Sequence, residues 1–228
     1  MATKADRRVG SLRMSEWTEF AGNKLNLILT ELSLQPLEQS QADAFREYLS
    51  LLLRWNSRMN LTAIRDEEGI LRRHFVESIL CARLIPSGIN TLLDFGSGAG
   101  FPGIPIAICR PEISVTLAES QGKKAAFLNE ALRVLAIAAK VHSGKAEELG
   151  SGFDCVTLRA VDKMQAAVQS ATQLIRPGGS MALMTTGREV EKLKEAAGRA
   201  FTWMVPVALP GGEDRILALG SRAISSPA

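Results

Sequence analysis

The sequence predicts an α/β fold: a group of helices followed by a mostly parallel, seven-stranded sheet with one antiparallel strand. Over about the first 90 residues, apolar positions recur at spacings of three and four, as in amphipathic helices. Beyond residues 86–88 (Pro-Ser-Gly), short apolar runs alternate with amphipathic helical stretches. That alternation is typical of a parallel sheet with helices on both faces. We therefore expect one structural domain, with a helical extension (residues 1–88) packed on an α/β core (residues 89–228).

Three helices are expected before the sheet. The stripe of the first helix comprises Trp17, Phe20, Ala21, Leu25, Ile28 and Leu32. A second stripe covers residues 45–59, and Pro36 suits the first turn of that helix because a first-turn residue needs no amide N–H. A third helix is expected over residues 74–84, ending before Pro86.

The core should alternate strands with helices. Strands are expected at residues 91–95, 114–117, 140–142, 155–158, 180–184, 203–208 and 216–219. Helices are expected at residues 123–136, 162–175 and 188–200. Residues 209–214 leave no room for a helix between the last two strands, so these should form a hairpin that makes one strand antiparallel.

Composition limits the classes of protein that need considering. The chain has 228 residues, enough for one good core, and its formal charge of +3 permits a polyanionic partner without requiring one. No apolar run approaches the roughly 20 residues that span a bilayer, and the N-terminus has no apolar stretch like that of a secretory signal. Cys81, Cys109 and Cys155 lack CxxC spacing and lie in apolar contexts, which favours reduced thiols in the cytoplasm and indicates no metal site.

A glycine-rich loop is the main functional signal. Residues 92–105 read LLDFGSGAGFPGIP, in which a strand reaches Asp94 and Gly96, Gly98 and Gly100 follow at alternate positions. Glycines let the backbone turn sharply and approach a ligand, and the first strand–helix crossover of an open α/β sheet is where nucleotide-like ligands bind. The loop therefore predicts a nucleoside site that includes Gly96, Ser97 and Gly98.

The identity of the nucleoside rests on several residues around this loop. Residues 98–103 satisfy GxGxxG, so NAD is one alternative, although Pro102 and Pro105 remove N–H groups that a pyrophosphate would need. Asp94 suits the cationic amino acid end of S-adenosylmethionine. Glu119, at the end of the second strand, can accept hydrogen bonds from both ribose hydroxyls of either cofactor.

The later pattern resembles class I S-adenosylmethionine methyltransferases, which have a Rossmann-like fold. Phe153-Asp154 opens the fourth strand, and residues 176–179 (Arg-Pro-Gly-Gly) precede the fifth. Backbone groups of Ala146 and Glu147, after the third strand, can bind the edge of the adenine. An acidic helix start without a ligand explains those two residues equally well.

The segment LDFGSGAGFPGIPIAI, residues 93–108, resembles the signature of the bacterial ribosomal RNA small subunit methyltransferase G family, also called glucose-inhibited division protein B. Further similar segments lie at residues 51–66, 74–80, 122–130 and 159–161. The resemblance implies that S-adenosylmethionine is bound by Gly96, Phe101, Ala146, Glu147 and Arg159. Two departures are Thr186-Gly187 where the family has Lys-Gly, and Glu77 where it has Asp.

The resemblance also implies the reaction, methylation of N7 of a guanosine in 16S ribosomal RNA by a cytoplasmic enzyme that we expect to be monomeric. Guanine N7 has a lone pair and no proton, so transfer requires alignment and no general base, and we predict no catalytic acid or base. His74 and His142 are expected to be structural, and Arg159 to lie at the lip of the pocket. The expected RNA-binding cations are Arg54, Arg58, Arg65, Lys123 and Lys124.

Overall fold

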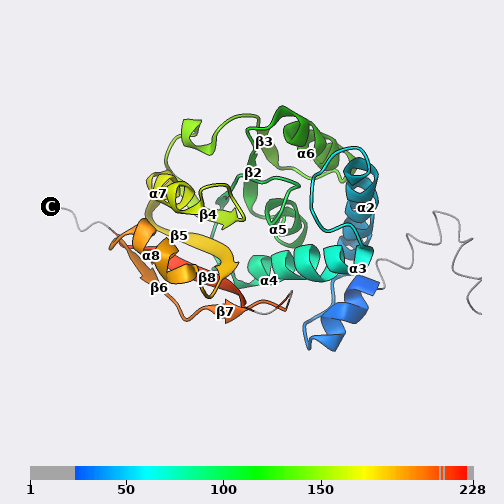
Figure 1. Cartoon of the computed structure of the whole chain (residues 1–228), viewed down its shortest axis with the longest axis horizontal. Helices are drawn as coiled ribbons and strands as arrows, with labels where there is room; N and C mark the ends of the chain where they lie inside the picture. Colours follow the sequence, from blue (N-terminus) through cyan, green and yellow to red (C-terminus); the bar gives the residue numbers. More distant parts are fainter. Residues whose placement is uncertain (1–23, 211, 213, 225–228) are drawn as a thin grey trace, which may run out of the picture.

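A computed structural model describes residues 24–210, 212 and 214–224 of the chain, and one sheet with helices on both faces forms its centre (Figure 1). Residues 24–31 are helical. The helices that follow before the sheet are α2 (Gln39–Asn56), α3 (Glu67–Ile70), the π-helical segment η1 (Leu71–Val76) and α4 (Glu77–Leu84). Of the first predicted stripe, Trp17, Phe20 and Ala21 lie outside the described residues.

Two of these helices begin at positions other than those predicted. Glu38 is the N-cap of α2 and forms a reciprocal capping box with Gln41, so Pro36 precedes the helix instead of occupying its first turn. The third helical segment begins at Glu67 and not at His74, because the Asp66 side chain accepts a hydrogen bond from the Gly69 amide and starts α3 about two turns earlier.

Within the described residues the sheet has eight strands. They are β1 (Thr91–Phe95), β2 (Ser114–Ala118), β3 (Lys140–His142), β4 (Phe153–Arg159), β5 (Ile175–Thr186), β6 (Phe201–Trp203), β7 (Val207–Ala208) and β8 (Arg215–Arg222). The spatial order is β3-β2-β1-β4-β5-β8-β6, with β7 also paired to β8. Neighbours from β3 to β5 are parallel, and β8 runs antiparallel to each of its partners. The one reversed strand is therefore confirmed.

The eighth strand arises because the run predicted at residues 203–208 is interrupted. β6 pairs with the end of β8 and β7 with its start, and Pro206 between them has no amide N–H for a ladder. β5 is also longer than predicted, since its pairing with β4 already begins at Ile175 and continues after a shift in register.

The helices of the core are α5 (Gly103–Cys109), α6 (Gly122–Val134), the 3-10 turn η2 (Ala146–Glu148), α7 (Met164–Leu174) and α8 (Val190–Ala197). Successive strand residues face opposite sides. Leu92 belongs to a buried cluster with α2, α4, α5 and α6, whereas Leu93 belongs to one with α7 and α8.

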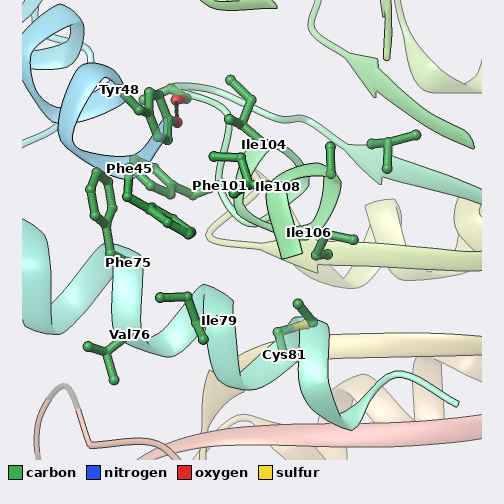
Figure 2. Packing of buried hydrophobic residues seen from close by; sticks show 14 of the residues in the cluster. Phe45, Tyr48, Phe75, Val76, Ile79, Cys81, Phe101, Ile104, Ile106 and Ile108 are labelled. Atoms are coloured by element: carbon green, nitrogen blue, oxygen red, sulfur yellow. Dashed lines mark hydrogen bonds between the residues drawn. The ribbon is translucent and has the colours of Figure 1, made fainter. Parts of the chain in front are cut away.

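The N-terminal helices share a core with one face of the sheet. Phe45 and Tyr48 of α2 pack against Phe75 of η1, and Tyr48 and Phe75 also contact Phe101 after β1 (Figure 2). The predicted domain boundary at residue 88 lies in the connection between α4 and β1. The helices before this connection and the sheet after it share one buried cluster. The boundary at residue 88 therefore separates two parts of the sequence that pack together.

The strand register determines where the functional site lies. Phe95 at the end of β1 is the partner of Ala118 in β2 and of Leu158 in β4. The residues that follow each of these, Gly96, Glu119 and Arg159, therefore meet at one edge of the sheet. β2 and β4 lie on opposite sides of β1, which makes this edge a topological switch point, the usual ligand position in open α/β sheets.

Two further properties bear on the sequence predictions. The three cysteines are free; Cys81 and Cys155 are buried as predicted, while Cys109 is partly exposed. No helix within the described residues has both the length and the apolar character needed to cross a bilayer.

Candidate functional site

A cavity of about 420 Å³ opens at the carboxyl ends of β1, β2 and β4. It is lined by the glycine loop, the ends of β2 and β4, and two residues from the segment between α2 and α3. The predicted site residues that line it are Gly96, Ser97, Gly98, Phe101, Glu119, Lys124 and Arg159. Their convergence brings together residues more than 60 positions apart in the sequence, from Gly96 to Arg159.

Four amide donors of the glycine loop are already hydrogen-bonded to protein acceptors. The Ser97 N–H donates to the Ala118 carbonyl at 2.9 Å, and the Gly98 N–H donates to the Glu119 carboxylate at 2.9 Å. The Gly100 and Phe101 N–H groups both donate to the Ser97 carbonyl. A pyrophosphate would require these donors, so the loop suits a nucleoside ligand without phosphates.

Gly96 and Gly100 provide backbone conformations that other residues rarely adopt. Gly96 has φ of +69°, and an added Cβ would lie 3.3 Å from methyl groups of Val161. Gly100 has φ of +90°, where a Cβ would clash with Ile104 and with the Tyr48 hydroxyl. That hydroxyl donates a 2.5 Å hydrogen bond to the Ala99 carbonyl and so ties the loop to α2.

Glu119 is buried at the centre of this edge. One carboxylate oxygen accepts from Gly98 and the other from the Gln121 N–H at 2.7 Å. Each carboxylate oxygen has a second lone pair. The pre-oriented carboxylate can therefore still accept ribose hydroxyls.

Asp94 lies beneath the loop and does not line the cavity. Its carboxylate accepts from the Thr157 hydroxyl at 2.8 Å and from the Gly103 N–H at 3.1 Å. Burial raises the pKa of this carboxyl to about 6, although these hydrogen bonds oppose the shift. The structure thus gives Asp94 a part in holding the loop, in place of the direct contact with a cationic ligand expected from its position at the strand end.

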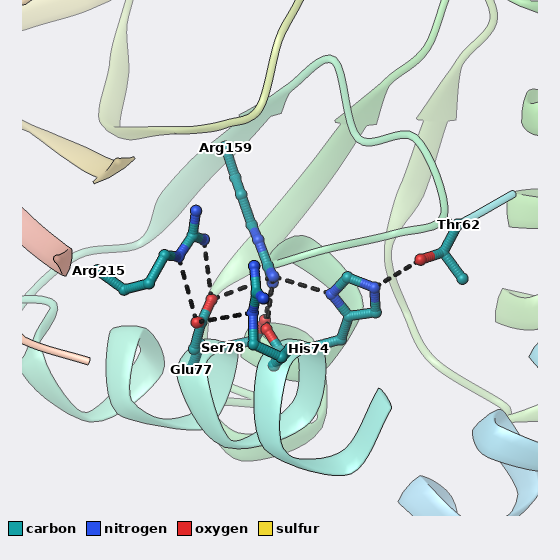
Figure 3. Close-up of polar contacts among 7 residues, drawn as sticks. Thr62, His74, Glu77, Ser78, Arg159 and Arg215 are labelled. Atoms are coloured by element: carbon teal, nitrogen blue, oxygen red, sulfur yellow. Dashed lines mark hydrogen bonds and ion pairs between the residues drawn. The ribbon is translucent and has the colours of Figure 1, made fainter. Parts of the chain in front are cut away.

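Arg159 is held in a buried polar network at the other end of the cavity (Figure 3). Its guanidinium lies 3.1 Å from the carboxylate of Glu77 and donates to His74 Nδ1 at 2.8 Å and to the Ser78 hydroxyl at 3.3 Å. Burial lowers the pKa of Arg159 to about 10, so it stays charged near neutral pH. Arg159 borders the pocket as predicted, but these donors already have protein acceptors.

Glu77 is the acidic centre of this network. It is fully buried and also pairs with Arg215 of β8 at 3.0 Å and with Arg73 at 3.8 Å. The longer carboxylate that stands in place of the family's Asp therefore joins the N-terminal helices to the last strand. Sequence reasoning had noted Glu77 only as a departure.

His74 lines the cavity and stacks on Phe101, with ring centroids 4.7 Å apart. Its Nε2 lies 2.7 Å from the hydroxyl of Thr62, which also lines the cavity. Burial and, after it, the positive charge of Arg159 lower the pKa of His74 to about 3, so the ring is neutral. The sequence offered no signal for the role of Thr62 beyond its presence in a family segment.

Ala146 and Glu147 form the start of η2 and do not line the cavity. Ala146 is buried, Glu147 is exposed, and no hydrogen-bond acceptor within the described residues is assigned to either amide N–H. The Glu119 N–H donates to the His142 carbonyl at 3.0 Å, so β3, which leads to η2, is held beside the cavity edge.

The predicted RNA-binding cations come from three neighbouring elements. Arg54 and Arg58, near the end of α2, are exposed around a hollow with Trp55, and Trp55 packs on Phe127 of α6. Lys123 and Lys124 lie in the first turn of α6, and only Lys124 reaches the cavity. Arg65 is exposed and donates to Asn60 in the loop that contributes Thr62. None of the five predicted cations forms an ion pair within the described part of the chain.

Two solved methyltransferases share the fold of this chain. The O-methyltransferase from Bacillus cereus, solved in complex with SAH, matches with a TM-score of 0.59 and 17% identity over 90% of this chain and 100% of that one. A SAM-dependent O-methyltransferase from Thermotoga maritima matches with a TM-score of 0.55 and 13% identity, over 78% of this chain and 73% of that one. At such identities the likeness shows the fold alone, which confirms the predicted Rossmann-like methyltransferase class.

Sequence relatives are much closer. A family model described as rRNA small subunit methyltransferase G matches residues 41–210. The Ribosomal RNA small subunit methyltransferase G of Xanthomonas campestris pv. campestris (strain B100) is 41% identical over 189 residues, covering 80% of this chain and 87% of the relative. The protein of the same name from Roseiflexus sp. (strain RS-1) is 40% identical over 197 residues, covering 80% and 84%. The chain therefore belongs to the ribosomal RNA small subunit methyltransferase G family.

Proposed function

We propose that this chain transfers the methyl group of S-adenosylmethionine to N7 of a guanosine in 16S ribosomal RNA, acting as a monomer in the cytoplasm. The proposal rests on a combination at the cavity. In the glycine loop the amides of Ser97, Gly98, Gly100 and Phe101 are already hydrogen-bonded, and the pre-oriented carboxylate of Glu119 lies beside them. This combination accepts a nucleoside and disfavours pyrophosphate. The substrate class comes from the relatives, which are ribosomal RNA small subunit methyltransferases.

The cofactor would be held by residues that the sequence and the cavity share. Gly96 and Gly98 allow close approach, and Glu119 accepts the ribose hydroxyls. The amides of Ala146 and Glu147 are outside the cavity lining and would bind the edge of the adenine from η2. Phe101 closes the cavity between the loop and His74. When bound, S-adenosylmethionine supplies an electrophilic methyl group on a sulfonium.

The neighbouring side chains position the acceptor without moving a proton. His74, the one imidazole on the cavity wall, has Nδ1 occupied by Arg159 and Nε2 by Thr62, so it has no free lone pair for a general base. N7 of guanine has no proton to lose, which matches this arrangement. We expect the single-turnover rate to be flat between about pH 7 and pH 9, since no group with a histidine-like pKa takes part.

Methyl transfer to small-subunit ribosomal RNA that lacks the modification tests the proposal. Radiolabelled S-adenosylmethionine, followed by mapping of the modified base, should identify 7-methylguanosine at one position. Labelling of a different atom, or of no RNA, would contradict the proposal. Equilibrium dialysis with S-adenosylmethionine and NAD separately tests the alternative cofactor, and preferential binding of NAD would exclude a methyltransferase.

The RNA surface has its own test. Arg54→Ala combined with Arg58→Ala removes two exposed cations, so the KM for RNA should rise and its dependence on salt should weaken, with S-adenosylmethionine affinity unchanged. Arg46→Ala on the same helix is the matched control, because Arg46 is already paired with Asp43. Equal KM values for the double variant and the control would place the RNA elsewhere.

A further inference from the structure

The hydroxyl of Thr62 occupies an unusual hydrogen-bonding position on the cavity wall. Arg159 Nη2 carries two N–H groups and can only donate. One N–H is directed to the Arg73 carbonyl and the other to His74 Nδ1, 2.8 Å away, so Nδ1 is an acceptor. A neutral imidazole carries one N–H, which is then on Nε2. The bond of 2.7 Å to Thr62 therefore runs from His74 Nε2–H to the Thr62 oxygen (Figure 3).

Thr62 accepts a second hydrogen bond as well. The Ile64 N–H donates to the same oxygen at 3.2 Å. A hydroxyl has two acceptor lone pairs and one proton, so both lone pairs are used and only the proton remains. No acceptor for that proton is found among the described residues. Thr62 is thus locked as a hydrogen-bond donor at a cavity wall.

We propose that Thr62 determines base specificity by donating a hydrogen bond to O6 of the target guanine. The proposal rests on the function proposed above. The major-groove edge of guanine presents two acceptors, N7 and O6, whereas adenine presents N7 and an amino donor. N7 must remain free to take the methyl group, which leaves O6 as the neighbouring atom for a donor.

Thr62 is selective because both lone pairs of its hydroxyl oxygen are occupied, by His74 Nε2–H and by the Ile64 N–H. A threonine hydroxyl without these hydrogen bonds can donate or accept and would tolerate either purine. With both lone pairs occupied, the hydroxyl binds O6 and leaves the amino group of adenine unpaired. Glu77, Arg159 and His74 act as positioning residues, because they fix the tautomer that occupies Thr62.

A crossed comparison of enzyme and substrate variants tests this contact. Wild type, Thr62→Ser and Thr62→Val are each given small-subunit RNA with guanine or 2-aminopurine at the target position, under single-turnover conditions with enzyme and S-adenosylmethionine saturating. 2-Aminopurine keeps N7 and lacks O6. The guanine/2-aminopurine rate ratio should be about tenfold smaller for Thr62→Val than for wild type, the typical effect of one neutral hydrogen bond. Thr62→Ser should keep the wild-type ratio.

The two bases also differ in the intrinsic reactivity of N7. This difference affects the guanine/2-aminopurine rate ratio of wild type and of each Thr62 variant equally, so it cancels when the ratios are compared. Equal ratios for wild type and Thr62→Val would overturn the proposal while leaving the methyltransferase activity in place. Loss of S-adenosylmethionine affinity in Thr62→Val would also overturn it, since the acceptor would then belong to the cofactor. Failure of wild type to methylate guanine N7 would instead refute the proposed function itself.

A second variant tests the lock if Thr62→Val does not fold. His74→Phe keeps an aromatic ring beside Phe101 and removes the Nε2–H, so the Thr62 oxygen regains a free lone pair. Discrimination against 2,6-diaminopurine, which carries an amino group at position 6, should fall about tenfold relative to wild type. Unchanged discrimination in a folded His74→Phe variant would overturn the proposal.

Discussion

Replacing His74 by glutamine should change how the stability of this protein depends on pH. A glutamine can accept from Arg159 and donate to Thr62, as the neutral histidine does, but it does not titrate. The pKa of His74 is about 3 in the folded chain because of burial and then the charge of Arg159, and its ordinary value is 6.5. The unfolded chain therefore binds a proton that the folded chain refuses.

The size of the effect follows from linkage. The stabilisation is fully present above pH 6.5 and is lost as the pH falls towards 3, because only the unfolded state gains the proton in that window. Between pH 7 and pH 5 the loss is about 2 kcal/mol. Asp94 acts in the opposite sense: its pKa, raised to about 6, stabilises the fold as the pH falls. That contribution is the same in both proteins and cancels in their difference.

Urea unfolding at pH 7, 6 and 5 measures this directly. The free energy of unfolding of wild type should fall by about 2 kcal/mol relative to that of His74→Gln as the pH drops from 7 to 5. A constant offset between the two proteins is expected from the lost stacking on Phe101 and is not informative. Parallel stability curves would refute the neutral, locked imidazole and with it the donor-only state of Thr62.

Three further substitutions test the site and its support. Gly96→Val should abolish S-adenosylmethionine binding while circular dichroism shows a retained fold, because the site has positive φ and Val161 lies 3.3 Å from an added Cβ; normal affinity would remove the loop from the cofactor site. Glu119→Ala should weaken S-adenosylmethionine binding at least about tenfold in equilibrium dialysis, since charged acceptors to ribose are lost, and unchanged affinity would contradict that assignment. Glu77→Ala should lower the free energy of unfolding by about 3–5 kcal/mol in urea, because buried arginines lose their counter-charge. Glu112→Ala, at an exposed ion pair, should change it by less than about 1 kcal/mol, and equal losses would mean that the Glu77 network is not stabilising.

Local sequence patterns were sufficient to predict most of the fold. Alternation of apolar runs with helical stripes predicted a mostly parallel sheet, and the short connection at residues 209–214 predicted one antiparallel strand, which is β8. The predicted boundaries were wrong where a helix cap or a proline overrides the apolar pattern. Pro36 lies outside α2 because Glu38 and Gln41 cap the helix, and Pro206 divides the run between β6 and β7.

The sequence by itself determined the ligand-binding edge, because strand ends and glycines are local signals. Gly96, Glu119 and Arg159 could be predicted as neighbours since parallel strands bring their carboxyl ends together. What only the tertiary structure decided is the direction in which side chains point and what they already bind. Asp94 turns under the loop to Thr157, and Glu77, His74 and Thr62 become one network. That network depends on contacts between segments that are far apart in the sequence, such as those of Glu77 with Arg159 and Arg215. The spacing of residues along the chain does not indicate which of them become hydrogen-bond partners.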